Sequence, residues 1–237
     1  MRCSLSIAYN GTHFFGSQIQ KETTNTILGN LERVLSQLGI KDKVIASGRT
    51  DKGVHATAQI CHVDLPEFWT NLEKLKKVLN QMLPSSIQVK HVKAVSNDFH
   101  ARYSAKKRVY RYIIKNSQTT PFENDFVTFI ENIDFNELEK NIQLFIGEHN
   151  FINFIKTGSD INSTIRVIYK AFAYRHKDYI VLNFEANGFL RSQIRLMVGA
   201  LLNLSANEIK EKLSCEYNHK TKPSPANGLY LAKIKYK

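Results

Sequence analysis

The sequence predicts an α+β protein made of two similar split-βαβ-like halves, with a mostly antiparallel central sheet and helices packed on one face. Apolar residues alternate with polar ones in several short runs, which is typical of strands with one buried face. Other runs place apolar residues three and four positions apart, which is typical of amphipathic helices. A strand–helix–strand order occurs twice along the 237 residues, so each half has helices of its own.

The first half begins with an alternating strand over residues 3–9 and continues with a helix over 27–38. A short strand at 44–46 then leads through the turn Asp51-Lys52-Gly53 into a strand over 55–64. A second helix over 72–82 ends before Pro84, which cannot continue a helix. Two further strands, rich in Val, Ile and Tyr, are predicted at 86–95 and 106–115.

The second half repeats this alternation. The predicted elements are a helix over 134–146, strands over 164–175 and 179–186, a helix over 189–204 and a last strand over 230–236. No Gly/Ser-rich or Pro-rich linker separates the halves. We therefore expect a soft boundary between residues 1–125 and 126–237.

The charge balance indicates a polyanionic partner. The chain has 33 Lys and Arg against 21 Asp and Glu, a formal net charge of +12, which favours nucleic acid first and an anionic membrane surface second. No apolar run reaches the roughly 20 residues that span a bilayer, and the N-terminus lacks a signal-peptide pattern. We expect a cytoplasmic protein without a membrane partner. Because the three cysteines and eight histidines do not cluster, we expect no metal.

The segment RYSAKKRVYRYIIK, residues 102–115, contains six basic residues and no acidic one. In a strand, Tyr110 and Tyr112 share one face. Cations neutralise phosphates and an aromatic ring offers a face to an unstacked base, which suits RNA. The alternative is a buried tyrosine strand with a solvated basic approach. The candidate RNA contacts are Tyr110, Arg102, Lys106, Lys107, Arg108 and Arg111.

The stretch ASGRTDKGVHATAQ, residues 46–59, places Arg49 beside Asp51 at a bend. An Asp-Lys-Gly sequence is a natural hairpin turn, and this role alone explains it. The functional interpretation requires Arg49 to hold the Asp51 carboxylate ionised through a charge-assisted hydrogen bond. Arg191 and Arg195 lie one turn apart on the predicted C-terminal helix. Arg195, at the edge of the apolar stripe, is the better candidate for an arginine that points inward to a carboxylate.

These motifs together resemble the tRNA pseudouridine synthase A (TruA) family along the whole chain. The matching segments, in family order, are YNGTHFFGSQIQ, SGRTDKGVHATAQ, FHARYSAKKRVYRYII, GFLRSQIRLMVG and PANGLYLAKIKY. The sequence departs from the family pattern at Asn10 and Asn150, where aspartate is common, at Ser17 for tryptophan, and at Leu28 for glutamine.

The resemblance implies an isomerase that converts uridine to pseudouridine at positions 38 to 40 of the tRNA anticodon stem-loop. It implies that Asp51 is the essential aspartate, Arg49 its neighbour, Tyr110 the ring stacked on the target base and Arg195 the arginine that pairs with the aspartate. It also implies a cleft between the halves, a homodimer, and neither a metal nor a cofactor.

Two other function classes compete with this interpretation. A non-catalytic RNA-binding protein would keep the docking surface, but the presence of Arg49, Asp51 and Tyr110 argues against it, and the usual RNA-recognition signature is missing. A metal-dependent nuclease would need an acidic cluster near Asp51, and the sequence has none there.

Overall fold

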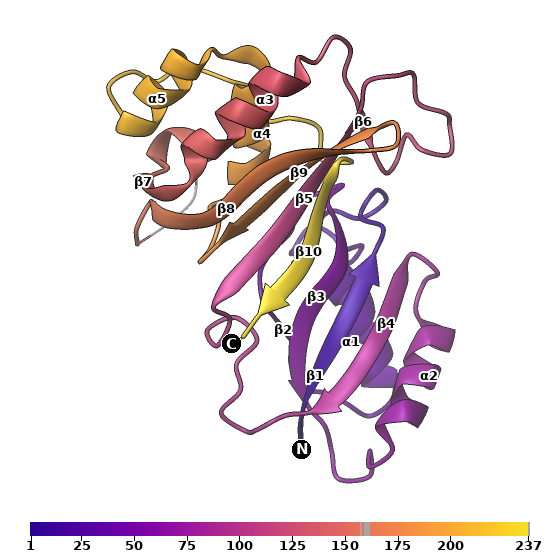
Figure 1. Cartoon of the computed structure of the whole chain (residues 1–237). Coiled ribbons are helices and arrows are strands. Elements are labelled where there is room, and N and C mark those ends of the chain that lie inside the picture. Colours follow the sequence, from indigo (N-terminus) through magenta and orange to yellow (C-terminus); the bar gives the residue numbers. More distant parts are fainter. Residues whose placement is uncertain (157, 159–161, 237) are drawn as a thin grey trace. The chain divides into compact units, whose positions relative to one another are not determined.

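The computed structural model describes residues 1–156, 158 and 162–236 (Figure 1). The chain divides into two compact units, the first formed by residues 1–106 with 230–237 and the second by residues 107–229. This division differs from the boundary expected near residue 125. The strand that carries Tyr110 pairs along eight residues with a strand of the second unit, whereas the last strand pairs with the first unit.

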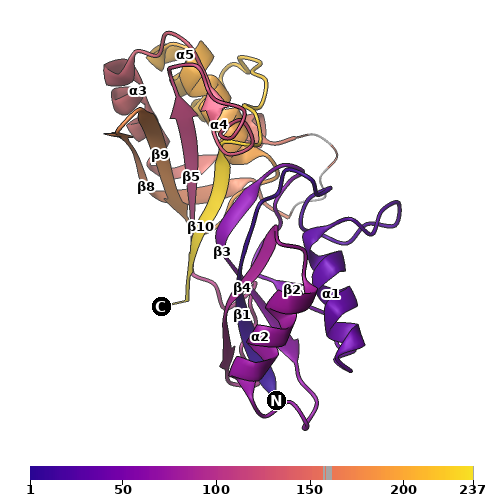
Figure 2. The same cartoon turned by 90° about the vertical axis from the view of Figure 1, so that its right-hand side faces the viewer.

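The first unit contains a mostly antiparallel sheet in the order β4-β1-β3-β10. Strand β1 (Arg2–Tyr9) pairs antiparallel with both β3 (His55–Asp64) and β4 (Ile87–Ala94). The last strand, β10 (Leu229–Lys235), pairs parallel with β3. The short β2 (Ile45–Ala46) also pairs with β3, in the antiparallel direction. Helices α1 (Ile27–Gln37) and α2 (Leu72–Met82) lie on the same side of this sheet (Figure 2).

The predicted periodicities account for this unit. Alternate residues of β1 are buried, and Cys3, Leu5 and Ile7 are fully inaccessible, because one face of the strand packs beneath the helices. Thr26 caps α1 by accepting a hydrogen bond from the backbone N–H of Gly29, and Asn71 caps α2 in the same way at Lys74. Both helices are confirmed at the predicted positions.

The second unit contains the strand order β5-β9-β8-β7, all antiparallel. Its long strands are β5 (Lys107–Lys115), β8 (Ile165–His176) and β9 (Tyr179–Ala186), while β7 (Gly147–Asn150) and β6 (Thr128–Phe129) are short. Ala171 and Ala173 of β8 are buried, whereas Phe172 and Tyr174 are more than a third exposed. The helices therefore cover one face of this sheet, as expected for the α+β class.

The helices of the second unit differ in detail from the prediction. The helix expected over 134–146 consists of α3 (Phe135–Asn141) followed by the 3-10 turn η1 (Ile142–Phe145), and a second 3-10 turn, η2 (Ile152–Phe154), follows β7. The helix expected over 189–204 is α4 (Gln193–Asn203), which begins later because Ser192 adopts a left-handed backbone with φ 59°. Helix α5 (Ala206–Ser214) was not predicted.

Within residues 1–156, 158 and 162–236, no helix is both long and apolar enough to cross a membrane. In the same described residues, no three His, Cys, Asp or Glu side chains are grouped in a way that could hold a metal ion.

Candidate active site

Asp51 lies in the loop between β2 and β3, which we call the Asp51 loop, residues 47–54. The loop starts where the Ser47 N–H donates to the carbonyl of Ile60, continuing the β2–β3 ladder. It ends in the predicted turn, where the Val54 N–H donates to the Asp51 carbonyl at 3.1 Å and Gly53 has φ 79°. The positive φ explains the glycine, since other residues rarely adopt it. The turn is confirmed.

The N-terminal segment after β1 clamps this loop from one side. Ser17 is only 1% exposed. Its Oγ accepts from the Thr50 N–H at 2.8 Å, and its own N–H donates to the Thr50 carbonyl at 3.0 Å. The Thr50 hydroxyl also shares a 2.8 Å hydrogen bond with the Tyr9 hydroxyl. Both backbone groups of the residue before Asp51 are therefore fixed by a side chain and a backbone 33 residues away.

A second contact fixes the end of the loop. The Gly11 N–H donates to Nδ1 of the buried His55 at 3.1 Å, and a Cβ on Gly11 would lie 2.0 Å from the Val54 carbonyl oxygen. The His55 ring stacks on Tyr230 with centroids 4.7 Å apart, and burial raises the pKa of Tyr230. Asp51 is thus carried on a short backbone that is held at both ends.

Arg49 does not make the contact that the sequence predicts. Its side chain is exposed and forms no hydrogen bond or ion pair with any residue that the structure describes. Asp51 itself is partly exposed and does interact with the protein. Arg49 and Asp51 are separated only by Thr50, so closeness in sequence did not ensure a contact. The Arg49 guanidinium remains available to an anionic ligand.

Tyr110 lies in the second unit, on β5 opposite Phe184 of β9. Its side chain is buried, with 9% of the residue exposed, and its ring meets Phe189 edge to face at 5.3 Å. Tyr112 on the same strand face is inaccessible, with its hydroxyl bonded to the Thr128 hydroxyl and to the Pro225 carbonyl. Burial is the main cause that raises the pKa of Tyr112 to about 12.

Arg195 lies on α4 in the same unit and is half-buried, whereas Arg191 is exposed. Its Nε donates to the Ser224 carbonyl at 2.6 Å, and the Ser224 N–H donates back to the Arg195 carbonyl at 2.9 Å. Close packing of α4 at Gly199, where a Cβ would lie 2.2 Å from the Lys222 carbonyl oxygen, supports this arrangement. The guanidinium is therefore oriented by a backbone carbonyl.

The predicted basic RNA contacts fall into two groups. Arg102, Lys106 and Arg111 are exposed. Lys107 and Arg108 are partly buried and make contacts inside the second unit. The Lys107 ammonium lies 3.5 Å from the Glu185 carboxylate and 4.4 Å from the centre of the Tyr169 ring, and Arg108 donates to the Asn187 carbonyl at 2.7 Å.

Sequence reasoning missed several residues of this site. Ser17 and Tyr9 hold the Asp51 loop through Thr50, His55 accepts the bond from Gly11 at its end, and Phe189 packs on Tyr110. The pKa of Arg166 is lowered, mainly by burial and to a smaller extent by the positive charge of the nearby Arg108. The sequence did contain one indication of their role, because Tyr9 and Ser17 both lie in the motif YNGTHFFGSQIQ, on which the family resemblance partly rests. The four predicted catalytic residues are divided between the units, and the cleft expected between the halves stays a prediction.

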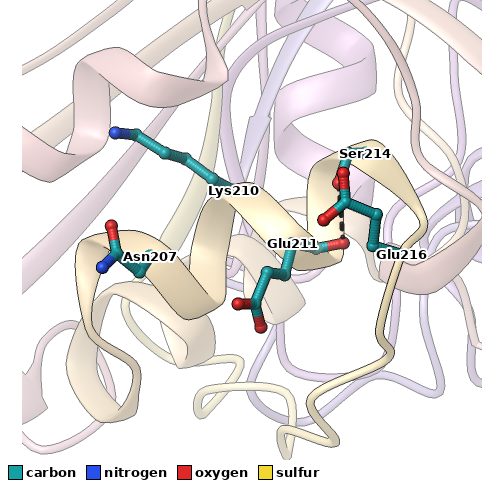
Figure 3. Close-up of a pocket in the computed structure, with 5 residues that line it drawn as sticks. All are labelled: Asn207, Lys210, Glu211, Ser214 and Glu216. Atoms are coloured by element: carbon teal, nitrogen blue, oxygen red, sulfur yellow. Dashed lines mark hydrogen bonds between the residues drawn. The ribbon is translucent and has the colours of Figure 1, made fainter.

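Two hollows in the described surface lie away from these residues. One of about 260 Å³ is formed by side chains on and just after α5, among them Lys210, Glu211 and Glu216 (Figure 3). Another, of about 660 Å³, lies along α2. Neither is lined by a predicted site residue.

Comparison with known proteins identifies the family. The model of a family described as tRNA pseudouridine synthase matches residues 5–104 and 142–237. Its two matched ranges include Arg49, Asp51 and Arg195, while Tyr110 lies between them. Three curated relatives, all called tRNA pseudouridine synthase A, are similar along nearly the whole chain. Those of Campylobacter jejuni (strain RM1221), Wolinella succinogenes and Phytoplasma mali are 37%, 38% and 36% identical.

These matches cover 100%, 97% and 98% of this chain and 100%, 92% and 97% of the relatives. Among solved structures, a chain of the Cbf5-Nop10-Gar1 complex aligns over 84% of this chain and 45% of that chain, with a TM-score of 0.40 and 9% identity. That likeness is too low to carry an argument, and the full-length matches carry the assignment. The chain belongs to the tRNA pseudouridine synthase family.

Proposed function

We propose that this protein isomerises uridine to pseudouridine in the anticodon stem-loop of tRNA, at positions 38 to 40, and that Asp51 is the catalytic group. The family isomerises uridine in tRNA, and the match extends over the full chain. The observation that carries the assignment to Asp51 is that its loop is held by two hydrogen bonds from the N-terminal segment, at Thr50 and at His55, the first residue of β3. A carboxylate on such a fixed backbone is preorganised for catalysis.

The reaction breaks the bond between ribose C1′ and uracil N1, turns the base, and joins C5 to C1′. The C5 proton is lost and N1 takes up a proton, so nothing is oxidised or reduced and no group is added. One carboxylate therefore suffices. Asp51 either attacks covalently, at the ribose or at uracil C6, or removes a ribose proton so that a glycal forms.

The other predicted residues support that carboxylate. Each route requires an ionised Asp51, and a positive charge nearby favours the ionised form. We assign this role to Arg195, whose guanidinium is oriented by the Ser224 carbonyl, and to Arg49 once a substrate is bound. A stacked uridine must be extruded at a cost of a few kcal/mol. We assign to Tyr110, backed by Phe189, the recovery of part of that cost by stacking.

The charge distribution supports an RNA substrate. Of the net charge of +12, the first unit contributes +9, with 17 Lys and Arg against 8 Asp and Glu. The unit that carries Asp51 is therefore the more attractive one for phosphates. The contacts with RNA that we propose are Arg102, Lys106 and Arg111, which are exposed, together with Lys107 and Arg108.

The test uses unmodified tRNA labelled with tritium at uridine C5, incubated with the protein without added metal or cofactor. Wild type should release tritium, and Asp51→Asn, which keeps the shape of the side chain, should not. EDTA should have no effect, since we propose no metal. If wild type binds tRNA but releases no tritium, a non-catalytic RNA-binding protein is favoured instead. If EDTA abolishes tritium release, a metal-dependent enzyme is favoured.

Position specificity is tested with transcripts in which only one of the three uridines, 38, 39 or 40, is retained. Release from these transcripts and not from one that lacks all three would support the proposed specificity. Release from the triple-substituted transcript would place the target elsewhere in the tRNA.

We also propose a cytoplasmic homodimer. Tyr169, Phe172 and Tyr174 on β8 are 37% to 42% exposed, an apolar surface of the kind that protein–protein contacts cover. Light scattering of the purified protein should give twice the mass of 27.2 kDa, and Phe172→Lys should shift it toward the monomer. A monomeric wild type at assay concentrations would refute the dimer.

A further inference from the structure

The segment that joins β4 to β5, residues 95–106, contains neither a helix nor a strand, yet its backbone is held at several points. Arg2 donates from Nη1 to the Phe99 carbonyl at 3.3 Å. His62, which is buried, accepts at Nδ1 from the Ala101 N–H at 3.1 Å, and the Tyr236 hydroxyl donates to the Ala101 carbonyl at 2.9 Å. The backbone of this irregular link is therefore held by hydrogen bonds from three other parts of the first unit.

The contacts within the segment orient Tyr103. Nδ1 of His100 accepts from the N–H groups of Arg102 and Tyr103 at 3.2 and 3.1 Å. The His100 N–H donates to the Ser104 hydroxyl at 3.0 Å, which closes the turn. The Tyr103 ring stacks on the His100 ring, with centroids 4.4 Å apart and planes at 25°.

Although it is fixed in this way, Tyr103 is 76% exposed. Its stacking on His100 covers one ring face, so most of the remaining surface of the ring faces solvent. The Arg102 guanidinium carbon lies 5.7 Å from the ring centre. Holding a large aromatic side chain in water gains little for folding, because the ring stays hydrated. The arrangement is instead typical of a preformed binding surface.

The chemistry around the ring indicates the ligand class. Arg102 and Lys106 are exposed, and the one carboxylate of the segment, Asp98, accepts a hydrogen bond from the Ser96 hydroxyl. A flat π-surface beside cations matches a nucleobase with its phosphates, because bases stack on aromatic rings and phosphates bind cations. The positive charge of the first unit favours the same ligand.

We infer that Tyr103, backed by His100, is a stacking platform for an unpaired base of the RNA substrate, and that Arg102 and Lys106 hold the adjoining phosphates. The inference rests on the proposed function, because it takes the RNA substrate from it. The platform contributes to binding the RNA and takes no part in the isomerisation itself.

The test measures the affinity for fluorescently labelled unmodified tRNA over a series of salt concentrations. Tyr103→Ala should weaken binding by roughly 5- to 150-fold, the range found when a stacked aromatic is removed, without changing the salt dependence. Tyr103→Trp should bind nearly as well as wild type. Arg102→Gln should lower the slope of log affinity against log salt by about 0.7 to 0.9.

The matched control is Tyr217→Ala in the second unit. Tyr217 is 63% exposed and also packs against a histidine, but edge-on, with ring planes at 63°. This variant should bind as wild type does. Thermal unfolding of all variants checks that the loss for Tyr103→Ala is not a loss of fold.

Binding by Tyr103→Ala within twofold of wild type would overturn the platform, as would binding by Tyr103→Trp as weak as that of Tyr103→Ala. Tritium release separates this result from the proposed function. If wild type releases tritium and Tyr103→Ala binds normally, the platform is wrong and the function stands. If wild type binds through Tyr103 and releases no tritium, the function is wrong and the platform stands.

Discussion

Replacing Ser17 with alanine should impair the Asp51 loop through one lost hydrogen bond. The Ser17 hydroxyl accepts from the Thr50 N–H at 2.8 Å, and both residues are buried, at 1% and 7% exposed. Alanine keeps the backbone bond from the Ser17 N–H to the Thr50 carbonyl but leaves the Thr50 N–H without its acceptor.

The size of the loss in Ser17→Ala depends on whether the Asp51 loop stays in place or moves. If the loop stays in place, an unsatisfied buried N–H costs about 1 to 3 kcal/mol of unfolding free energy. If the loop moves until the N–H reaches water, stability is largely retained but Asp51 is displaced, and a shift of about 1 Å can cost about 100-fold in rate. The loss therefore divides between stability and kcat, and KM changes little because Ser17 is too buried to contact RNA.

The assay combines tritium release under single-turnover and steady-state conditions with denaturant unfolding. Ser17→Cys, nearly isosteric and a weak acceptor, should fall between wild type and Ser17→Ala. The matched control is Asn80→Ala. The Asn80 side chain donates to the Val89 carbonyl and accepts from the Val89 N–H, but it lies outside the Asp51 loop. It should lower stability without changing kcat. Unchanged stability and unchanged kcat in Ser17→Ala would refute the clamp.

Three further predictions follow from other contacts. Gly11→Ala should cost roughly 1 to 3 kcal/mol or more and abolish tritium release, because its Cβ would lie 2.0 Å from the Val54 carbonyl oxygen; near-normal melting and release would contradict it. Burial, helped by the positive charge of Arg2, lowers the pKa of His62. The folded state therefore binds fewer protons than the unfolded state, and the free energy of unfolding should fall as the pH drops below about 6.5. Denaturant unfolding at several pH values should show a weaker pH dependence of stability for His62→Gln. Hydrogen bonds, first of all from Tyr179, lower the pKa of Glu123 to about 2, so its contribution should be present above the ordinary value near 4.5 and disappear toward pH 2; Glu123→Gln should lack this transition in acid unfolding.

The sequence predicted the elements whose periodicity is strong. Helices α1 and α2 and the long strands lie within one or two residues of the predicted bounds, because their buried faces repeat regularly. The late start of α4 was not predictable from apolar spacing, since it depends on the left-handed backbone of Ser192. Helix α5 did carry a signal, the capping box that Ser205 and Glu208 form.

The site was predictable in its residue types and not in its contacts. Asp51 lies on the predicted turn, because local sequence determines a turn. What fixes the turn comes from far along the chain, at Ser17 and Gly11, and no spacing rule connects those segments. The expected bond between Arg49 and Asp51 is not formed, although only Thr50 separates the two residues in the sequence.

The four departures from the family pattern have a common physical feature, which is that each position still makes hydrogen bonds in the fold. Oδ1 of Asn10 accepts from the Thr12 N–H at 3.0 Å, and Oδ1 of Asn150 accepts from the Ile152 N–H and the Thr164 hydroxyl. An aspartate in either place would accept the same bonds, so asparagine preserves the turn and removes only a charge. The Leu28 N–H donates to the Ser17 carbonyl at 3.0 Å through its backbone, which any side chain allows. Ser17 is different, because its hydroxyl makes a bond that tryptophan could not accept. Ser17 therefore holds the Asp51 loop through its hydroxyl as well as its backbone, and Ser17→Ala removes the hydroxyl contact alone.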